Sequence, residues 1–290
     1  MRIEIAPGVR LFVDVEGPAF VPDGTGLREK PTLLLLHGGP GFDHSSFKPL
    51  FSRLADVAQV VYYDHRGHGR SDPRPSEEWT LDTFADDVVR LCSALGIERP
   101  VVLGHSFGGF VAQRYLARHP AHPAAVVLSS TSPHLGLARK LAVFERLGGA
   151  AAREAAERFW TQPGAGTWAE YERVCLPLYN TRPAADPQTS KRIRFRPEIL
   201  FAWAGGEQRS MNLLPGLAGV QCPVLVLVLV LVLAGDQDPV CPLEDAQDIA
   251  AALPLRWSRF ACVEGAGHGT WRDRPDEVLA RLRAFIGDGV

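Results

Sequence analysis

The chain has 290 residues, 46% of them hydrophobic, and a formal net charge of −2 at pH 7. This length and hydrophobic content allow one large core with insertions. The small net charge gives no electrostatic reason to bind nucleic acid or an anionic membrane, so we expect neither partner. The first residues lack an apolar stretch of signal-peptide length, and the five cysteines include no Cys-x-x-Cys pair. We therefore expect a cytoplasmic protein with reduced thiols.

Strand-like and helix-like segments alternate over the first part of the chain. An antiparallel hairpin is expected at residues 2–6 and 10–15, and a surface loop at 18–30. Buried strands are expected at 32–37, 57–64, 101–105 and 124–129, with helices at 81–95 and 107–119. This alternation predicts a mostly parallel sheet covered by helices on both faces, with ligands bound beyond the carboxyl ends of the strands.

The segment from Gly104 to Gly109 reads Gly-His-Ser-Phe-Gly-Gly and stands between an apolar run and a helix-like stretch. Gly-x-Ser-x-Gly at a strand-to-helix junction forms a tight, strained turn, and its glycines remove side chains that would clash there. The turn exposes the hydroxyl of Ser106 at a helix N-terminus, where free N–H groups favour developing negative charge. The pattern predicts Ser106 as a nucleophile.

A serine nucleophile needs a histidine base and an acidic residue that orients the histidine. Asp236 and Asp238 follow an apolar run that ends at Leu233, and His268 stands in the glycine-rich segment 265–269. Both aspartates remain candidates on strand parity alone. The order Ser, Asp, His is the one expected of an α/β-hydrolase and differs from the order in other serine hydrolase folds.

Residues 224–233 consist of five Val-Leu dipeptides in tandem. The run is about twice as long as a usual strand of about 5–6 residues. It is too short for a membrane span, which needs about 20 apolar residues. Because side chains alternate with period two, added dipeptides keep each residue type on its own face, so Asp238 stays in register. We expect the excess to emerge at the opposite edge of the sheet.

From Leu33 to about Ile286 the chain resembles the α/β-hydrolase family. Residues 33–41, Leu-Leu-Leu-Leu-His-Gly-Gly-Pro-Gly, resemble its oxyanion-hole strand and loop, and residues 64–71 resemble the loop after its next strand. The resemblance implies the α/β-hydrolase fold, with a mostly parallel central sheet flanked by helices and an inserted helical cap. Its Gly-x-x-Asp pattern favours Asp238 over Asp236 as the acid.

The resemblance also implies an oxyanion hole made of two backbone N–H groups. One belongs to Phe107, directly after the nucleophile, and the other comes from residues 37–41. Pro40 has no N–H to offer. Gly39 is the first choice, with Gly38 or Gly41 as alternatives.

Residues 132–219 lose the strand pattern and contain helix-like stretches with many aromatic residues. We expect this segment to form the cap, inserted between core residues 1–131 and 220–290. In the family, an insertion at this point covers the active site and shapes the substrate pocket.

The His-Gly-Gly-Pro-Gly form of residues 37–41 is similar to the proline iminopeptidase branch, which implies release of an N-terminal proline from a short peptide. Such an enzyme must bind a protonated amine, and Glu207, near Trp203, is the first candidate carboxylate, with Glu170 and Glu172 as alternatives. The elbow is equally common among esterases and lactonases. The cap carries 12 Lys or Arg against 8 Asp or Glu, which weakens the aminopeptidase hypothesis and favours the second one, a carboxylesterase or lactonase on small acyl substrates. The aminopeptidase remains our first prediction. A third hypothesis is a ligand-binding protein on the same scaffold.

No pattern indicates a metal or a cofactor. Four histidines lie in the motif loops but lack the spacing of His-Glu-x-x-His, and we expect structural roles for them: His37, His65, His68 and His105. Asp64 and Arg66 are expected to brace their own turn.

Overall fold

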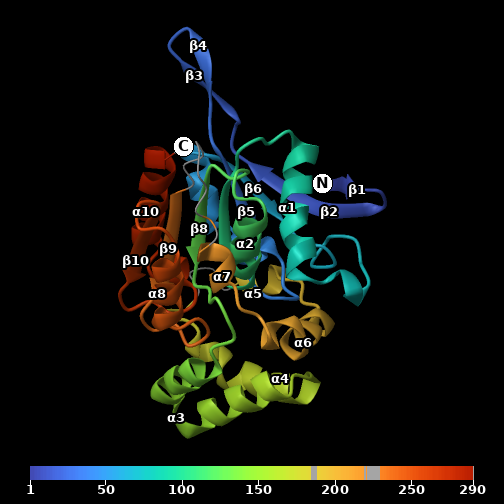
Figure 1. The fold of residues 1–290 in the computed structure, drawn as a ribbon, viewed down its shortest axis with the longest axis vertical. Helices are drawn as coiled ribbons and strands as arrows, with labels where there is room; N and C mark the ends of the chain where they lie inside the picture. Colours follow the sequence, from blue (N-terminus) through green and yellow to red (C-terminus); the bar gives the residue numbers. More distant parts are fainter. Residues whose placement is uncertain (184–187, 219, 221–228, 290) are drawn as a thin grey trace.

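The computed structural model describes residues 1–183, 188–218, 220 and 229–289 (Figure 1). The strands are β1 (Arg2–Ala6), β2 (Val9–Glu16), β3 (Phe20–Asp23), β4 (Gly26–Glu29), β5 (Thr32–Leu36), β6 (Gln59–Tyr63), β7 (Val101–His105), β8 (Ala125–Ser129), β9 (Leu229–Gly235) and β10 (Ser258–Val263). The α-helices are α1 (Leu81–Leu95), α2 (Phe107–Arg118), α3 (Leu137–Thr161), α4 (Ala165–Val174), α5 (Thr189–Arg192), α6 (Pro197–Gly205), α7 (Leu214–Ala218), α8 (Leu243–Ala252), α9 (Thr270–Asp273) and α10 (Pro275–Gly289). Short 3-10 helices are η1 (His44–Phe47), η2 (Leu50–Asp56), η3 (Ser76–Glu78), η4 (Leu176–Leu178) and η5 (Glu207–Arg209).

Within the described residues, eight strands form one mixed sheet in the order β1-β2-β6-β5-β7-β8-β9-β10. β1, β2 and β6 are antiparallel neighbours, whereas the strands from β6 to β10 run parallel. Their near-continuous apolar sequences are typical of strands buried on both faces. This confirms the predicted α/β class and its mostly parallel sheet.

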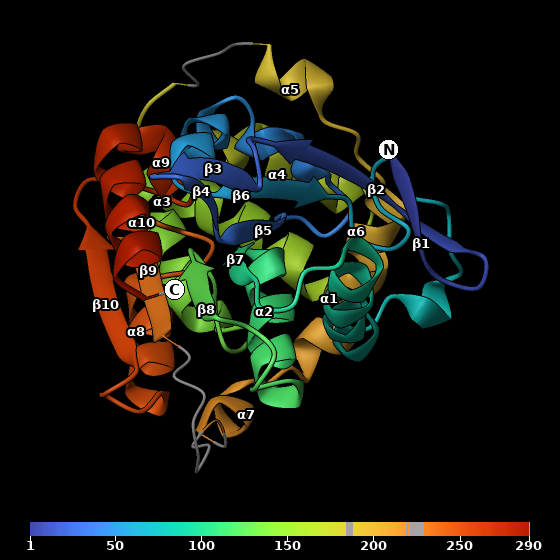
Figure 2. The ribbon, with the colours of Figure 1, turned by 90° about the horizontal axis from the view of Figure 1, so that it is seen from above.

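Alternate residues of each parallel strand pack into two separate cores, because successive side chains point to opposite faces of a sheet. Leu34 and Leu36 of β5 belong to the core that includes residues of α1, α2 and α8. Leu33 and Leu35 belong to the core that includes residues of η2 and α10. Figure 2 shows α1 and α2 together on one face of the sheet. Each fully buried leucine contributes about 1.5–3 kcal/mol of hydrophobic stabilisation.

Helix α1 begins and ends where its sequence signals predict. The hydroxyl of Thr80 accepts the N–H of Thr83 at 3.2 Å, which satisfies one of the free N–H groups of the first turn. Gly96 follows the helix with φ 70°, a left-handed conformation that favours glycine.

The segment between β8 and β9 contributes no strand to either sheet within the described residues. Its helices α3 and α4 lie at the lower end of the molecule in Figure 1. They share a third core of aromatic side chains, among them Phe144, Phe159, Trp168 and Tyr171. This helical segment occupies the region for which the cap was predicted.

Residues 18–30 differ from the expected loop. They form the antiparallel hairpin β3–β4, in which Phe20 pairs with Glu29 and Asp23 with Gly26, and the hairpin projects from the body of the protein (Figure 1). Gly24 has φ 59°, and a glycine at the first central position allows a two-residue hairpin turn. The loop prediction was wrong because it counted the glycines and prolines of the segment as loop signals, whereas Gly24 lies in the turn and Pro22 and Gly26 lie within the two strands.

Strand β9 contains the second half of the Val-Leu run. Its first residue, Leu229, pairs with Ala125, the first residue of β8, so the neighbouring strand begins at the same level. Val230 and Val232 face one core and Leu231 faces the other, as the two-residue period predicts. The expected exit of the excess residues concerns 224–228, which lie outside the described residues.

In the part of the chain that the structure covers, no helix combines the length and the apolar character needed to cross a membrane.

Candidate functional site

Four loops meet at the carboxyl edge of the parallel strands. Gly38 follows β5, Ser106 follows β7, Asp238 follows β9 and His268 follows β10. Because these strands are parallel members of one sheet, their carboxyl ends lie on the same side. The topology therefore brings together residues that are up to 230 positions apart in sequence.

Ser106 lies in the strained turn that its sequence predicts. Its φ is 53°, a conformation that is uncommon for a residue other than glycine. A Cβ on Gly104 would lie 2.3 Å from the carbonyl oxygen of Gly108, and a Cβ on Gly108 would lie 2.1 Å from that of Leu36. Glycines at these positions let the helix α2 begin directly against strands β5 and β7, which holds the serine at the strand edge.

Ser106, His268 and Asp238 form a continuous hydrogen-bonded chain. The Oγ atom of Ser106 lies 2.9 Å from Nε2 of His268, and Nδ1 of His268 lies 2.9 Å from Oδ2 and 3.1 Å from Oδ1 of Asp238. All three residues are at least nine-tenths buried. Because the carboxylate of Asp238 can only accept a hydrogen bond, Nδ1 of His268 carries the proton in the neutral imidazole. Its Nε2 is then unprotonated and faces the hydroxyl of Ser106.

The two candidate aspartates are separated by their contacts. Asp238 also accepts the backbone N–H groups of Val240 and Cys241, at 2.8 and 2.9 Å, which fix its carboxylate beside His268. Asp236 instead accepts the N–H of Ala266 at 3.3 Å. The geometry thus pairs the histidine with Asp238 and places Asp236 in support of the neighbouring loop.

The loop after β5 is held by His37. Its Nδ1 lies 2.7 Å from the carbonyl oxygen of Gly38, and its Nε2 accepts the backbone N–H of His65 at 3.0 Å. This pattern assigns the proton to Nδ1, which donates to Gly38. Burial lowers the pKa of His37, which keeps the ring neutral, as this pattern requires. The C=O of Gly38 points toward His37, so the N–H of Gly39, across the planar trans peptide, points the opposite way.

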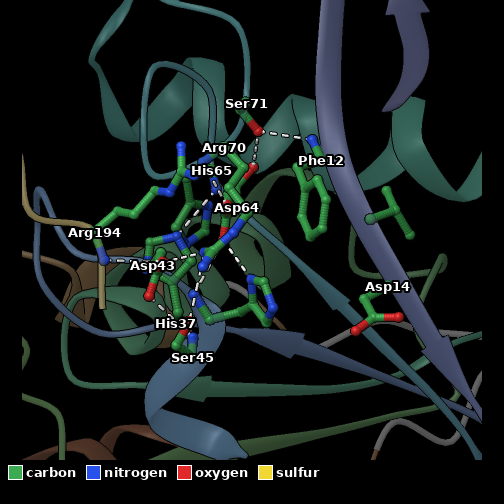
Figure 3. Close-up of polar contacts among 12 residues, drawn as sticks. Phe12, Asp14, His37, Asp43, Ser45, Asp64, His65, Arg70, Ser71 and Arg194 are labelled. Atoms are coloured by element: carbon green, nitrogen blue, oxygen red, sulfur yellow. Dashed lines mark hydrogen bonds and ion pairs between the residues drawn. The ribbon is translucent and has the colours of Figure 1, made fainter. Parts of the chain in front are cut away.

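Two buried carboxylates brace this loop and the next one (Figure 3). Asp64 accepts the N–H of His44 at 3.0 Å, Nδ1 of His44 at 2.6 Å and the N–H of Arg70 at 2.7 Å. Burial alone would raise the pKa of Asp64, but the hydrogen bonds from the His44 side chain and from the backbone N–H of Arg70 outweigh it, and the pKa lies below its ordinary value. Asp64 therefore braces its turn, as the sequence predicts.

Asp43 connects the same region to the helical segment. Its carboxylate accepts the N–H of Ser45 at 3.0 Å and the N–H of Arg194 at 3.1 Å, and it pairs with the guanidinium of Arg70. All of its oxygens are therefore engaged, although the residue borders the cavity described next.

A cavity of about 960 Å³ opens onto Ser106 and His268. Its walls come from both the strand-end loops and the helical segment, and they include the cationic side chains of Lys48, Arg53 and Arg272. The largest group of side chains is apolar or aromatic: Phe42, Leu50, Phe159, Trp160, Trp168, Leu176, Tyr179, Ile193, Leu200, Val240 and Trp271. Gly38 and Gly39 also line the cavity, and Gly38 lies beside the serine. Such a pocket suits an apolar group attached to a reacting carbonyl.

The predicted substrate-binding pair does not border this cavity. Oε2 of Glu207 accepts the backbone N–H of Leu81 at 3.0 Å, at the first turn of α1. Trp203 packs its ring against Phe107, with centroids 5.1 Å apart, within the core on the α2 side of the sheet. The expectation for Glu207 is thus corrected, because its carboxylate satisfies a free N–H group at a helix start. Of the alternatives, Glu170 pairs with Arg158 on the surface.

Among the residues that the structure describes, two groups of side chains have ligand atoms close enough for a metal ion, and both groups are engaged in other contacts. Asp238 and His268 are bonded to each other, and burial raises the pKa of the third member, the thiol of Cys241. In the second group, formed by His134, Asp245 and Asp248, both carboxylates contact Arg139, at 2.8 and 2.5 Å. A cation would have to displace that arginine.

Two residues next to His268 were not anticipated from the sequence. The carbonyl oxygen of Tyr179 accepts the N–H of His268 at 2.6 Å, and the fully buried Asp273 accepts the N–H of Gly267 at 2.8 Å. Asp273 follows the histidine by five residues, a spacing that could have drawn attention to it. No local sequence pattern predicts the contact of Tyr179, because it is made by the backbone carbonyl.

Comparisons with known proteins agree with this architecture. The family profile for the alpha/beta hydrolase fold matches residues 31–270. The chain therefore belongs to the α/β-hydrolase family, whose members are generally hydrolases. A proline iminopeptidase of Pestalotiopsis fici is 24% identical over 286 residues, which cover 95% of this chain and 98% of that protein.

Solved structures share the fold. Proline iminopeptidase of Mycobacterium smegmatis matches with a TM-score of 0.72 at 22% identity, covering 99% of this chain and 97% of that one. An esterase of Exiguobacterium antarcticum matches with a TM-score of 0.70 at 18% identity, covering 99% of both chains. Peptidases and esterases thus occur among the proteins that this chain resembles.

Proposed function

We propose that this protein is a serine hydrolase that forms an acyl-enzyme on Ser106. The observation that carries the proposal is the chain of hydrogen bonds from Ser106 Oγ through His268 to Asp238, with 2.9 Å at each of its two links. A nucleophile, a base and a group that orients the base are the three parts that covalent catalysis by serine requires.

In the proposed mechanism, His268 takes the proton of Ser106 as the oxygen attacks an acyl carbon. The histidine then gives that proton to the leaving alcohol or amine, and the carbon–oxygen or carbon–nitrogen bond breaks. Water attacks the acyl-enzyme in the same way, with His268 again as base, and releases the acid. Asp238 holds the imidazole in the required tautomer and stabilises the transient imidazolium.

The developing oxyanion is assigned to the N–H groups of Gly39 and Phe107. Phe107 is the first residue of α2, so its N–H has no partner within the helix. His37 holds the carbonyl of Gly38 and thereby turns the N–H of Gly39 away from itself. A Cβ on Gly38 would lie 3.3 Å from Cβ of Ser106, which shows how closely this loop approaches the nucleophile. Gly39 remains our first choice over Gly38 and Gly41.

For the substrate, we propose an ester or lactone with an apolar acyl group. The walls of the cavity are mostly apolar, and Asp43 is the single carboxylate among its described lining residues, beside the cationic Lys48, Arg53 and Arg272. Asp43 already forms an ion pair with Arg70 and accepts the N–H groups of Ser45 and Arg194, so a substrate amine would have to compete with these partners for its charge. A buried ammonium group without a carboxylate partner would be costly.

The second candidate is an aminopeptidase that releases N-terminal proline. The similarity of residues 37–41 to the proline iminopeptidase branch favours it, as does the relative from Pestalotiopsis fici. The corrected position of Glu207 removes its first candidate for binding the amine.

The test compares hydrolysis of p-nitrophenyl butyrate with that of proline p-nitroanilide. We expect the wild-type protein to hydrolyse the ester, and Ser106→Ala to lose this activity by at least about 1,000-fold, in line with the loss of a serine nucleophile. Ser76→Ala, an exposed serine, is the matched control. A fluorophosphonate should label the wild type and the control but not Ser106→Ala.

Faster turnover of the proline anilide than of the ester would favour the aminopeptidase. Folded wild-type protein that neither turns over substrate nor reacts with the fluorophosphonate would contradict both enzymatic candidates and leave a ligand-binding role.

A further inference from the structure

Residues 179–182, which we call the cap strap, lie directly on the loop that carries His268. The carbonyl oxygen of Tyr179 accepts the N–H of His268 at 2.6 Å. The hydroxyl of Thr181 donates to the carbonyl oxygen of Gly265 at 2.8 Å. The helical segment and the histidine loop are thus joined by one backbone–backbone hydrogen bond at His268 itself and by one side-chain hydrogen bond three residues earlier.

This close approach depends on a glycine in the histidine loop. A Cβ on Gly267 would lie 2.2 Å from the carbonyl oxygen of Tyr179, a distance that real Cβ atoms do not adopt. The strap therefore rests against the peptide that directly precedes His268.

The carboxylate of Asp273 binds both the histidine loop and the cap strap. Its Oδ2 atom accepts the N–H of Gly267 at 2.8 Å and the N–H of Thr181 at 3.0 Å, and its Oδ1 accepts the N–H of Arg182 at 3.0 Å. The side chain is fully buried. Hydrogen bonds to a carboxylate are about twice as strong as those between neutral groups, and an unsatisfied buried N–H is costly.

We propose that Asp273 is a positioning residue that couples the docking of the cap strap to the orientation of His268. The inference rests on the proposed function, because it concerns the base of that mechanism. Asp273 holds the N–H of Gly267, and the strap carbonyl of Tyr179 holds the N–H of His268, so the backbone is fixed at both residues. Because Asp273 also binds the strap, both of these hydrogen bonds depend on it. A change at Asp273 shifts the imidazole relative to Ser106.

The decisive variant is Asp273→Asn, which keeps the shape of the side chain. Whichever way the amide is oriented, its NH2 group faces at least one of the three N–H groups. Asp236→Asn is the matched control, because Asp236 also accepts an N–H of the histidine loop, from Ala266 at 3.3 Å, with no contact to the strap among its described hydrogen bonds. kcat is measured per active site, by titration of Ser106 with a fluorophosphonate.

Two substrates separate the possible roles of Asp273. p-Nitrophenyl acetate has an acyl group too short to reach far into the cavity, whereas p-nitrophenyl octanoate extends along the walls that the helical segment supplies. A misplaced base lowers kcat for both esters, whereas a loosened cap alone raises KM for the octanoate.

For Asp273→Asn we expect kcat to fall at least about tenfold on both esters, because a displacement of the order of 1 Å can cost about 100-fold. Asp236→Asn should stay within about twofold of the wild type. An unchanged kcat per active site, with only a lower melting temperature, would overturn the proposal. So would an effect confined to KM for the octanoate.

A second pair of variants keeps the test open if Asp273→Asn does not fold. Thr181→Val removes the hydrogen bond to Gly265, and we expect kcat to fall about threefold, as for one ordinary hydrogen bond. Thr181→Ser keeps the hydroxyl and should restore the wild-type value. Equal kcat in both variants would contradict the coupling. Failure of the proposed function would show differently, as wild-type activity that survives Ser106→Ala.

Discussion

Arg66 and Asp87 form a buried, two-pronged ion pair between the loop after β6 and helix α1. Nε of Arg66 lies 2.7 Å from Oδ2 of Asp87, and Nη2 lies 2.6 Å from Oδ1. The two side chains are 7% and 2% exposed. Glu78 contacts the third nitrogen of the same guanidinium, at 2.5 Å. The ion pair ties the loop after β6, whose residue His65 donates its N–H to His37, to helix α1.

This pairing predicts a large effect for Arg66→Gln. We expect the free energy of unfolding to fall by about 3–5 kcal/mol, because the variant leaves the carboxylate of Asp87 buried without its main partner. Arg90→Gln is the control, since Arg90 contacts the same carboxylate at 2.9 Å from an exposed position and should cost less than about 1 kcal/mol. Urea unfolding measures both. Equal losses in the two variants would contradict the assignment.

The buried histidines predict a loss of stability in mild acid. Burial lowers the pKa of His68 to about 3 and that of His65 well below its ordinary value. In the unfolded chain both titrate near pH 6.5, so below that pH the unfolded state binds more protons than the folded state. Stability that is complete above about pH 6.5 therefore declines as the pH falls, by about 1.4 kcal/mol per pH unit for each such histidine.

His68→Gln tests this contribution separately from that of the carboxylates. Glutamine gains no proton, so between pH 6 and pH 4.5 the variant should lose stability less steeply than the wild type, by about 1.4 kcal/mol per pH unit. Urea unfolding at several pH values gives the two slopes. Parallel slopes would show that His68 does not stay neutral in the folded protein.

The turn at Ser106 predicts a gain in stability when the nucleophile is replaced by glycine. Its φ of 53° is strained for any residue with a Cβ, at a cost of about 1–3 kcal/mol. Ser106→Ala keeps that strain, whereas Ser106→Gly relieves it. The gain in the free energy of unfolding is reduced by about 0.5–1 kcal/mol, because glycine has greater conformational freedom in the unfolded chain. We expect the glycine variant to be about 1 kcal/mol more stable than the alanine variant in thermal and urea unfolding. The reverse order would contradict the strain.

The contact between α2 and β5 predicts that Gly108 tolerates no side chain. In Gly108→Ala the new Cβ would meet the carbonyl oxygen of Leu36 at 2.1 Å, and we expect a loss of about 3 kcal/mol together with most of the hydrolase activity. Gly166→Ala in α4 is the control, because its Cβ meets nothing within 4 Å and should stabilise the helix by about 0.5–1 kcal/mol. Differential scanning calorimetry separates the two. Similar melting temperatures would show that the α2–β5 interface can move apart.

Local sequence features predicted the scaffold well. The strand before Ser106 and the helix after it follow from consecutive residues, because a glycine-flanked turn and an apolar run act within a few positions of the chain. The same holds for α1, whose boundaries at Thr80 and Gly96 are set by single residues. The alternation of Val and Leu predicted the two faces of β9, since the period of a strand is a property of its backbone.

Long-range packing decided where individual polar side chains point. Glu207 lies in the expected segment, yet its carboxylate bonds the N–H of Leu81, which is 126 positions away in the chain. The role of Asp273 likewise depends on the folded chain, because two of its hydrogen-bond donors are the N–H groups of residues 181 and 182 in the helical segment. A buried carboxylate binds whichever free N–H groups the fold brings within reach, and no local pattern records that choice.

The sequence by itself thus determined the α/β class, the order of Ser106, Asp238 and His268 along the chain, and the turn that carries the serine. Only the tertiary structure decided that these three side chains lie within hydrogen-bond distance, that the cavity beside them is mostly apolar, and that Asp43 is already paired with Arg70. The reason is physical: backbone conformation depends on neighbours in sequence, whereas charge pairing and cavity shape depend on neighbours in space.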